Sequence, residues 1–335
     1  MKLTPGKLAG MKAVSDPRGV IAAAAMDQRG SLQKSLGQAR GAAADTHDLE
    51  EFKTLVTEVL TRHASAILLD PEYGLGAARH RNGKGLLLAY EKTGYDSATP
   101  GRLPDLLDLW SVRRLKEAGA DCVKVLLYYT PFEKSHINDL KHAWIERIGD
   151  ECIAQDIPFF LEFVGYDADG GGEKSLAYAL KKPSIVSGSM AEFGKARYNV
   201  DVLKVEVPVE MAYVEGTKSF KGEKAYTRAE ALQHFRDAEG MTHKPFIYLS
   251  AGVSNPVFIE TLELAGESGT KFNGVLCGRA TWKDGIALYA TKGSSAFRDW
   301  LETTGVENIS RVNEALQAAS PWYLKFGANS LEALG

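Results

Sequence analysis

The sequence predicts a (β/α)8 barrel, the TIM-barrel class of α/β fold, as a single domain over residues 1–335 with extra helices in its loops and at its C-terminus. Eight short apolar runs alternate with amphipathic stretches, and no linker or shift in composition divides the chain. A doubly wound open sheet would use similar pieces, but no G-x-G-x-x-G segment follows the first run. Barrels of this class often exceed about 250 residues as one domain, so the length fits.

The predicted strands are the eight apolar runs. Most are too short for helices and end at glycine, proline, aspartate or serine, as buried parallel strands do. In chain order they cover residues 20–26, 66–69, 86–90, 122–129, 158–164, 202–207, 245–249 and 274–277.

The predicted helices lie between these runs. In residues 48–63, apolar side chains recur at Leu49, Phe52, Val56 and Val59, which is the spacing of one helix face. Residues 103–118, 142–155 and 228–239 follow the same pattern, and residues 181–200 and the tail after 308 predict additional helices. We expect residues 168–173 to form a mobile loop and residues 213–224 to form a lid.

Composition and charge narrow the classes of function. The chain has 40 lysines and arginines against 43 aspartates and glutamates, a net charge of −3, which argues against affinity based on nucleic-acid electrostatics. No apolar stretch approaches the length of a membrane span, so we expect a cytoplasmic protein. The three widely spaced cysteines and the scattered histidines match no zinc motif, so no metal and no cofactor is expected. Lys181 and Lys182 are typical of a solvated face.

The most informative residues are charges inside the apolar runs. In the sixth run the side-chain period of two turns Lys204 and Glu206 into the barrel, and the same alternation applies to Lys124 and Glu162 in runs four and five. Asp27 ends the first run. Buried ion pairs contribute little stability, so an internal salt-bridge network explains five such charges poorly. Glu206 could be catalytic, or it could only balance the charge of Lys204.

Two lysines among carboxylates suit Schiff-base chemistry. Burial and a second nearby cation favour the free amine of a lysine, which can attack a carbonyl, and the resulting imine accepts electrons when a carbon–carbon bond breaks. A carboxylate must move protons as the imine forms, and another group must accept the proton of the cleaved hydroxyl. Lys204, Glu162 and Asp27 fit these roles in that order. Lys124 supplies the second positive charge or binds a substrate oxygen.

Two later segments predict a phosphate site. Ser250 and Gly252 follow the seventh run, and Gly278 and Arg279 follow the eighth. Barrels commonly hold a phosphate in the loops after strands seven and eight, where backbone N–H groups, a hydroxyl and an arginine can surround it.

These segments resemble a known family, the class I tagatose-1,6-bisphosphate aldolases of the lactose-catabolism type, within the deoxyribose-phosphate/tagatose-bisphosphate aldolase superfamily. The matching segments run in family order over about residues 11–322. They are AAAAMDQRGSL, CVKVLLYY, PFFLEFVGYD, DVLKVEVPV, YLSAGV and GVLCGRATW. Of these, DVLKVEVP and AMDQRGSL are specific, whereas the hydrophobic flanks are not.

The resemblance implies cleavage of tagatose 1,6-bisphosphate to dihydroxyacetone phosphate and glyceraldehyde 3-phosphate, and several members also accept the fructose, sorbose and psicose epimers. It implies a Schiff base on Lys204, with Glu162 as the acid/base carboxylate, and a homo-oligomer, namely a dimer. The implied substrate contacts are Asp27, Gln28 and Lys124, and the implied phosphate contacts are Ser250, Gly252, Gly278 and Arg279.

Two alternatives stay open. The substrate could be another phosphorylated ketose, such as fructose 1,6-bisphosphate or sulfofructose 1-phosphate, or the protein could be a regulator that binds a sugar phosphate and catalyses little. For a second phosphate, the candidates are Arg29, Ser31 and Lys34.

Overall fold

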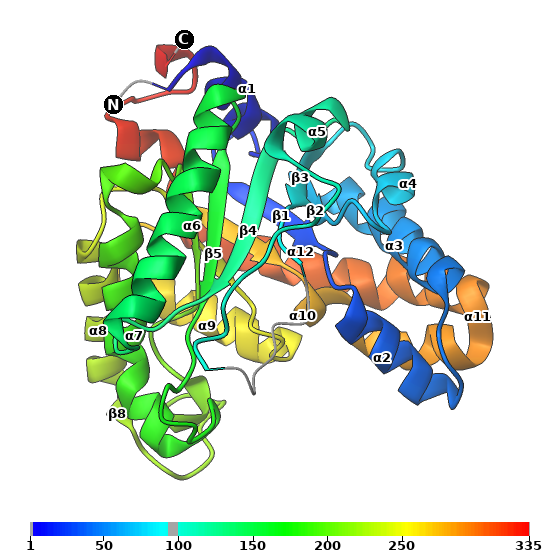
Figure 1. The fold of residues 1–335 in the computed structure, drawn as a ribbon. Helices are drawn as coiled ribbons and strands as arrows, with labels where there is room; N and C mark the ends of the chain where they lie inside the picture. Colours follow the sequence, from blue (N-terminus) through cyan, green and yellow to red (C-terminus); the bar gives the residue numbers. More distant parts are fainter. Residues whose placement is uncertain (1–2, 93–99, 335) are drawn as a thin grey trace.

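The computed structural model describes residues 3–92 and 100–334, in which eight parallel strands close into a barrel (Figure 1). Around the barrel the strands follow the order β1-β10-β9-β6-β5-β4-β3-β2. Their bounds are β1 Ile21–Ala25, β2 Ala66–Leu69, β3 Gly85–Ala89, β4 Cys122–Tyr128, β5 Phe159–Val164, β6 Val202–Val205, β9 Phe246–Leu249 and β10 Gly274–Cys277. Every predicted run forms a strand, which confirms the predicted barrel.

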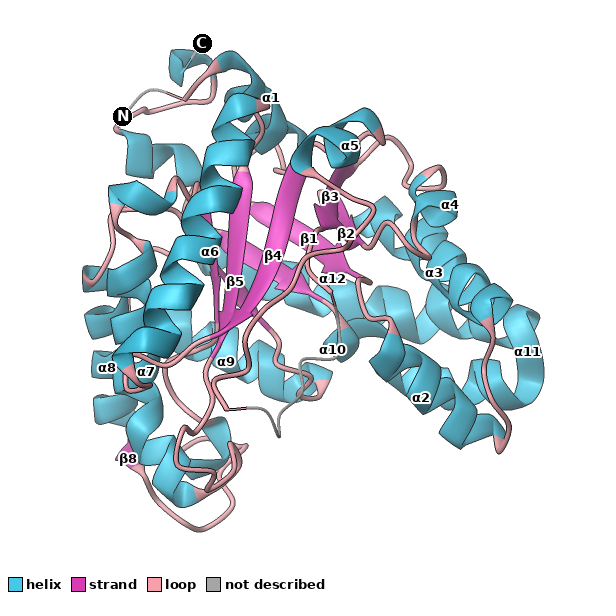
Figure 2. Cartoon of the chain, viewed as in Figure 1, coloured by secondary structure: helices cyan, strands magenta, loops and turns pink. Residues whose placement is uncertain are grey.

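Helices surround these strands (Figure 2). They are α1 Pro5–Ala13, α2 Gly30–Arg40, α3 Thr46–Leu60, α4 Leu75–Ala78, α5 Val112–Glu117, α6 Ser135–Ala154, α7 Leu176–Phe193, α8 Arg228–Gly240, α9 Asn255–Glu267, α10 Arg279–Trp282, α11 Ile286–Trp300 and α12 Val306–Ala315. Within the predicted lid, the short strand β7 Val214–Glu215 pairs with β8 Tyr226–Thr227, which directly follows the lid. None of the helices described is long and apolar enough to cross a membrane.

The predicted helix over residues 103–118 is largely wrong, because only Val112–Glu117 is helical. Pro104 disfavours a helical conformation in the residue before it. Leu106 instead forms an antiparallel bridge with Glu91, and Ser111 then caps the short helix. The predicted helix over residues 181–200 begins earlier, at the start of α7, and ends at Phe193.

The alternation of side chains along the strands divides the core into two layers. Cys122, Phe160 and Val202 point into the barrel, whereas their neighbours Val123 and Leu161 pack against the helices. Inside the barrel, one end is closed by apolar residues of α1 and by a buried tryptophan of the C-terminal tail, Trp322. The charged residues that follow along the same inner face therefore gather toward the other end, at the carboxyl ends of the strands.

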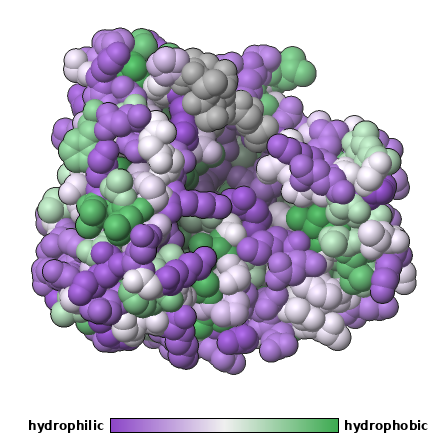
Figure 3. Space-filling view, turned by 90° about the horizontal axis from the view of Figure 1, so that it is seen from below, coloured by the Kyte–Doolittle hydropathy of each residue, from purple (hydrophilic) through white to green (hydrophobic). Residues whose placement is uncertain are grey.

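Figure 3 looks onto this end of the molecule and shows a hollow bordered by hydrophilic residues. The loops after the strands meet here, including the start of α2 and the turn before α10 (Figure 1). In barrels of this class, the carboxyl ends of the strands carry the active site.

Candidate active site

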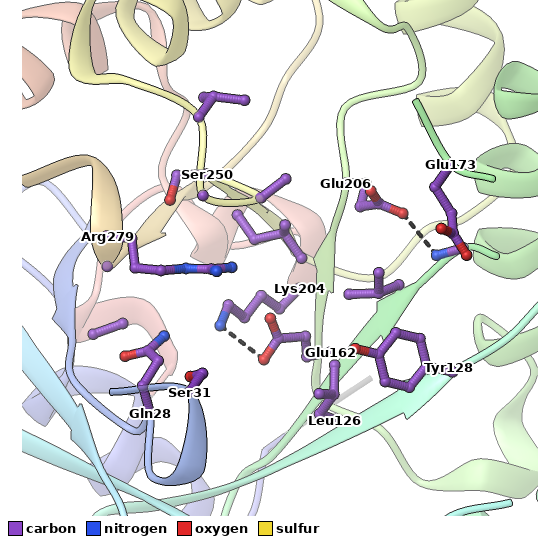
Figure 4. A pocket seen from close by; sticks show the side chains of 18 of the residues that line it. Gln28, Ser31, Leu126, Tyr128, Glu162, Glu173, Lys204, Glu206, Ser250 and Arg279 are labelled. Atoms are coloured by element: carbon purple, nitrogen blue, oxygen red, sulfur yellow. Dashed lines mark hydrogen bonds and ion pairs between the residues drawn. The ribbon is translucent and has the colours of Figure 1, made fainter. Parts of the chain in front are cut away.

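A cavity of about 970 Å³ lies at the carboxyl ends of the strands (Figure 4). It brings together all the residues that the sequence predicted for catalysis and substrate binding, although they come from six different strand ends. These residues are Asp27, Gln28, Lys124, Glu162, Lys204, Glu206, Ser250, Gly252, Gly278 and Arg279.

Lys204 and Glu162 face each other at the centre of the cavity (Figure 4). They are register partners on the adjacent strands β6 and β5, so both side chains point to the same face of the sheet. The Lys204 Nζ lies 2.8 Å from Glu162 Oε2, and Glu162 is the only ion-pair partner of Lys204 in the described part of the chain. A lysine with a single carboxylate partner can pass its proton directly to that carboxylate.

Lys124 is held very differently. Its Nζ lies 2.8 Å from each of three carboxylates, those of Asp27, Glu91 and Glu162. Burial alone would lower the pKa of Lys124, but Asp27, Glu162 and Glu91 outweigh burial and hold that pKa well above its usual range. Lys124 is therefore a permanent cation, unsuited to attack a carbonyl.

The two central carboxylates are held in the ionised form. Burial would raise the pKa of Asp27 and of Glu162, but the neighbouring charges of Lys124 and Lys204 hold both pKa values below their usual range. Both carboxylates are thus hydrogen-bond acceptors in the resting site, and they are weak bases until a lysine beside them loses its charge or moves away.

Glu91 was missed in the sequence, although it carries a signal. It comes directly after the third strand, and its side chain is buried against Lys124. Charged residues that directly follow a barrel strand are candidates for the active site. The same rule had selected Asp27, which ends the first run.

Glu206 does not pair with Lys204, contrary to one of the two predictions. Its carboxylate accepts a hydrogen bond from the Gly165 N–H at 2.7 Å and lies 3.6 Å from Lys182 Nζ. Burial raises the pKa of Glu206, and Lys182 only partly opposes this effect. The prediction that Lys182 belongs to a solvated face is also wrong, since the packing of α7 turns it into the cavity wall at 3% exposure. The neighbouring Lys181 is solvent-exposed.

The predicted phosphate residues form one wall of the cavity (Figure 4). After Ser250 the chain turns through Ala251 and Gly252, both at positive φ, and the Lys283 Nζ donates to the Gly252 carbonyl at 2.9 Å. A Cβ on Gly252 would lie 2.8 Å from the guanidinium carbon of Arg279. The glycine therefore lets Arg279 lie directly against the turn.

The three candidates for the second phosphate site lie in different surroundings. Arg29 is buried, and its two Nη groups donate at 2.6 Å to Glu72 and to the Glu91 carbonyl, so it is committed to the protein. Lys34 is exposed on α2 and is not among the residues that line the cavity. Ser31 does line it.

Comparisons with known proteins identify the family of the chain. A family model for the DeoC/LacD family aldolases matches residues 21–284. A tagatose 1,6-diphosphate aldolase of Listeria monocytogenes is 52% identical over 330 residues, which cover 98% of this chain and 97% of that protein. Tagatose 1,6-diphosphate aldolase 2 of Enterococcus faecalis is 54% identical over 331 residues, covering 98% and 99% of the two chains.

Among solved structures, the fructose-bisphosphate aldolase of Plasmodium falciparum superposes with a TM-score of 0.67 over 95% of this chain and 96% of that one. At 14% identity this likeness supports the fold alone. The family resemblance predicted from the motifs is confirmed by the family model and by the two closely similar relatives. The chain belongs to the DeoC/LacD family of aldolases.

Proposed function

We propose that this protein is a class I, metal-independent aldolase that cleaves tagatose 1,6-bisphosphate to dihydroxyacetone phosphate and glyceraldehyde 3-phosphate through a Schiff base on Lys204. The observation that carries the proposal is the unequal surroundings of the two central lysines. Three carboxylates keep Lys124 charged, whereas Lys204 has one carboxylate within reach to take its proton. Only Lys204 is thus suited to be the nucleophile.

In the proposed mechanism, Lys204 passes a proton to Glu162 and its free amine attacks the C2 carbonyl of the ketose. Glu162 returns the proton to the oxygen of the carbinolamine, which leaves as water to form the protonated imine. Cleavage of the C3–C4 bond sends its electron pair into the imine and yields an enamine, while the C4 hydroxyl loses its proton. Protonation of the enamine carbon and hydrolysis then release dihydroxyacetone phosphate.

We assign the C4 hydroxyl proton to Asp27. Its depressed pKa makes Asp27 a weak base while it touches Lys124, so this role requires that the bound substrate lengthen their contact. Lys124 meanwhile supplies the positive charge that stabilises the developing oxyanion.

The sugar is proposed from the two relatives, which are named for tagatose 1,6-diphosphate and align over nearly their whole length. Ser250, Gly252, Gly278 and Arg279 supply one phosphate wall. The alternatives are the fructose, sorbose and psicose epimers, sulfofructose 1-phosphate, and a regulator that binds without turnover. A panel of kcat/KM values for these phosphates separates the enzymes, and a turnover equal to that of Lys204→Met with binding intact would favour the regulator.

The decisive experiment is borohydride reduction with substrate bound, followed by peptide mass mapping. We expect one dihydroxyacetone phosphate adduct, on Lys204, and none in Lys204→Met. The absence of any labelled lysine would refute the Schiff-base mechanism. A label on Lys124 would be consistent with a Schiff base but would refute the assignment of roles to the two lysines.

The proposal includes a cytoplasmic location, which the sequence predicts, and a homodimer, which the family resemblance implies. Sedimentation of the purified protein tests the dimer, and fractionation of the producing cells tests the location.

A further inference from the structure

A fully buried lysine adjoins the catalytic cluster and has no part in the proposed mechanism. Lys53 lies in the middle of α3, and neither its side chain nor that of its ion-pair partner Asp70 is exposed at all. A buried ion pair is a weak source of stability, because desolvation cancels most of the attraction. This pair therefore calls for a second explanation.

The hydrogen bonds of Lys53 supply that explanation. Its Nζ donates to the Met26 carbonyl at 2.8 Å, to the Gln28 carbonyl at 2.7 Å and to Asp70 Oδ2 at 2.6 Å. Three acceptors require three N–H groups, which only the ammonium form possesses. The two carbonyls flank Asp27 in the chain, so a single cation grips the backbone on both sides of a residue that contacts Lys124.

The other end of this clamp is rigid as well. Asp70 directly follows β2, and its second carboxylate oxygen accepts hydrogen bonds from the backbone N–H groups of Glu72 and Tyr73 at 3.1 and 2.8 Å. Arg29 adds a parallel tie, since it joins Glu72 to the carbonyl of Glu91. The loop after β1 is thereby tied to the ends of β2 and β3.

We propose that Lys53 is a positioning residue for the aldolase reaction: its ammonium clamps the two carbonyls that flank Asp27 and so holds Asp27 and Gln28 toward Lys124 and the substrate. The inference rests on the proposed function. Without the clamp, the loop after β1 loses the two hydrogen bonds that hold the carbonyls of Met26 and Gln28.

The test compares Lys53→Met with one matched variant, Lys7→Met. Each variant removes a lysine–aspartate ion pair, since Lys7 of α1 contacts Asp201 at 2.8 Å, but only Lys53→Met releases the carbonyls beside Asp27. Lys7 lies on the helix that closes the opposite end of the barrel. Thermal unfolding shows which variants are folded, and kcat and the rate of borohydride trapping at Lys204 are then measured.

We expect kcat and the trapping rate to fall about 100-fold in Lys53→Met, the size of effect that a misplacement of about 1 Å produces. Lys7→Met should keep most of its activity even where its melting temperature falls. The acid limb of the pH dependence of kcat/KM should move to higher pH only in Lys53→Met, because Asp27 loses a neighbouring positive charge. The other charged groups that face Lys53, Asp70 and Arg29, are still present in that variant.

A folded Lys53→Met with the kcat and pH profile of Lys7→Met would overturn the proposal. If Lys53→Met does not fold, Lys53→Gln takes its place as an uncharged, shorter donor, and wild-type kcat in that variant would overturn the proposal equally. Borohydride trapping is first carried out on the wild-type protein. A wild type that traps no substrate refutes the proposed function, whereas normal trapping in both wild type and Lys53→Met refutes only the clamp.

Discussion

Removal of Lys124 tests the charge arrangement of the site most directly. In Lys124→Met, the carboxylates of Asp27, Glu91 and Glu162 lose a cation that lies 2.8 Å from each of them. Their oxygens are then no further apart than twice that distance. Two charges about 5.5 Å apart repel by about 3 kcal/mol at an effective dielectric constant of about 20, so at least one carboxylate must take up a proton.

We expect the free energy of unfolding of Lys124→Met at pH 7 to be about 3–5 kcal/mol lower than that of the wild type. This is the usual cost of leaving a buried charge unpaired. Lys204→Met is the matched control, because Glu162 then keeps Lys124 as its partner. Lys204→Met should lose all activity, but its free energy of unfolding should fall much less than that of Lys124→Met. Urea denaturation followed by circular dichroism measures both variants.

The stability of Lys124→Met should also depend on pH differently from that of the wild type. In the wild type, the folded pKa values of Asp27 and Glu162 lie below their unfolded values, so their stabilisation is complete above the unfolded pKa and is lost only as pH falls through the folded pKa. In Lys124→Met, burial without the cation raises these pKa values, and the folded state binds protons that the unfolded chain does not. The stability deficit should therefore shrink from pH 8 to pH 5. A deficit equal to that of Lys204→Met, and constant with pH, would refute the reasoning.

Two further predictions concern Arg279 in the phosphate wall and Lys141 in α6. Arg279→Met should raise KM for the bisphosphate and the inhibition constant of inorganic phosphate by about tenfold to a hundredfold, because a hydrogen bond to a charged group contributes about 1.5–3 kcal/mol; unchanged constants would remove Arg279 from the phosphate site. Burial lowers the pKa of Lys141 to about 8, so the unfolded state binds more protons above that pH and the contribution of Lys141 to stability rises between pH 8 and 10. Urea denaturation of Lys141→Met should lack this rise, and an identical slope in both proteins would contradict it.

The central pair of the site could be predicted from the sequence because it depends on local periodicity. The alternation in DVLKVEVP turns Lys204 inward, and consecutive barrel strands are neighbours, so Glu162 on the preceding strand must face it. The roles of Glu91 and Arg29 were not predictable in this way, since both follow a strand end and their directions depend on loop packing. The prediction for Lys182 was wrong for a similar reason, because the packing of α7 against the barrel decides which of two adjacent lysines is buried.

Local patterns in the sequence were enough to predict eight strands, their order along the chain and the inward direction of Lys124, Glu162 and Lys204, because each of these follows from a short repeat. The sequence assigned the nucleophile to Lys204, but it showed no contact that distinguishes Lys204 from Lys124. Only the tertiary structure surrounded Lys124 with three carboxylates and Lys204 with one, and turned Glu206 toward Lys182 instead. Electrostatic energy depends on distances between atoms of different elements, and these distances exist only once the barrel has closed.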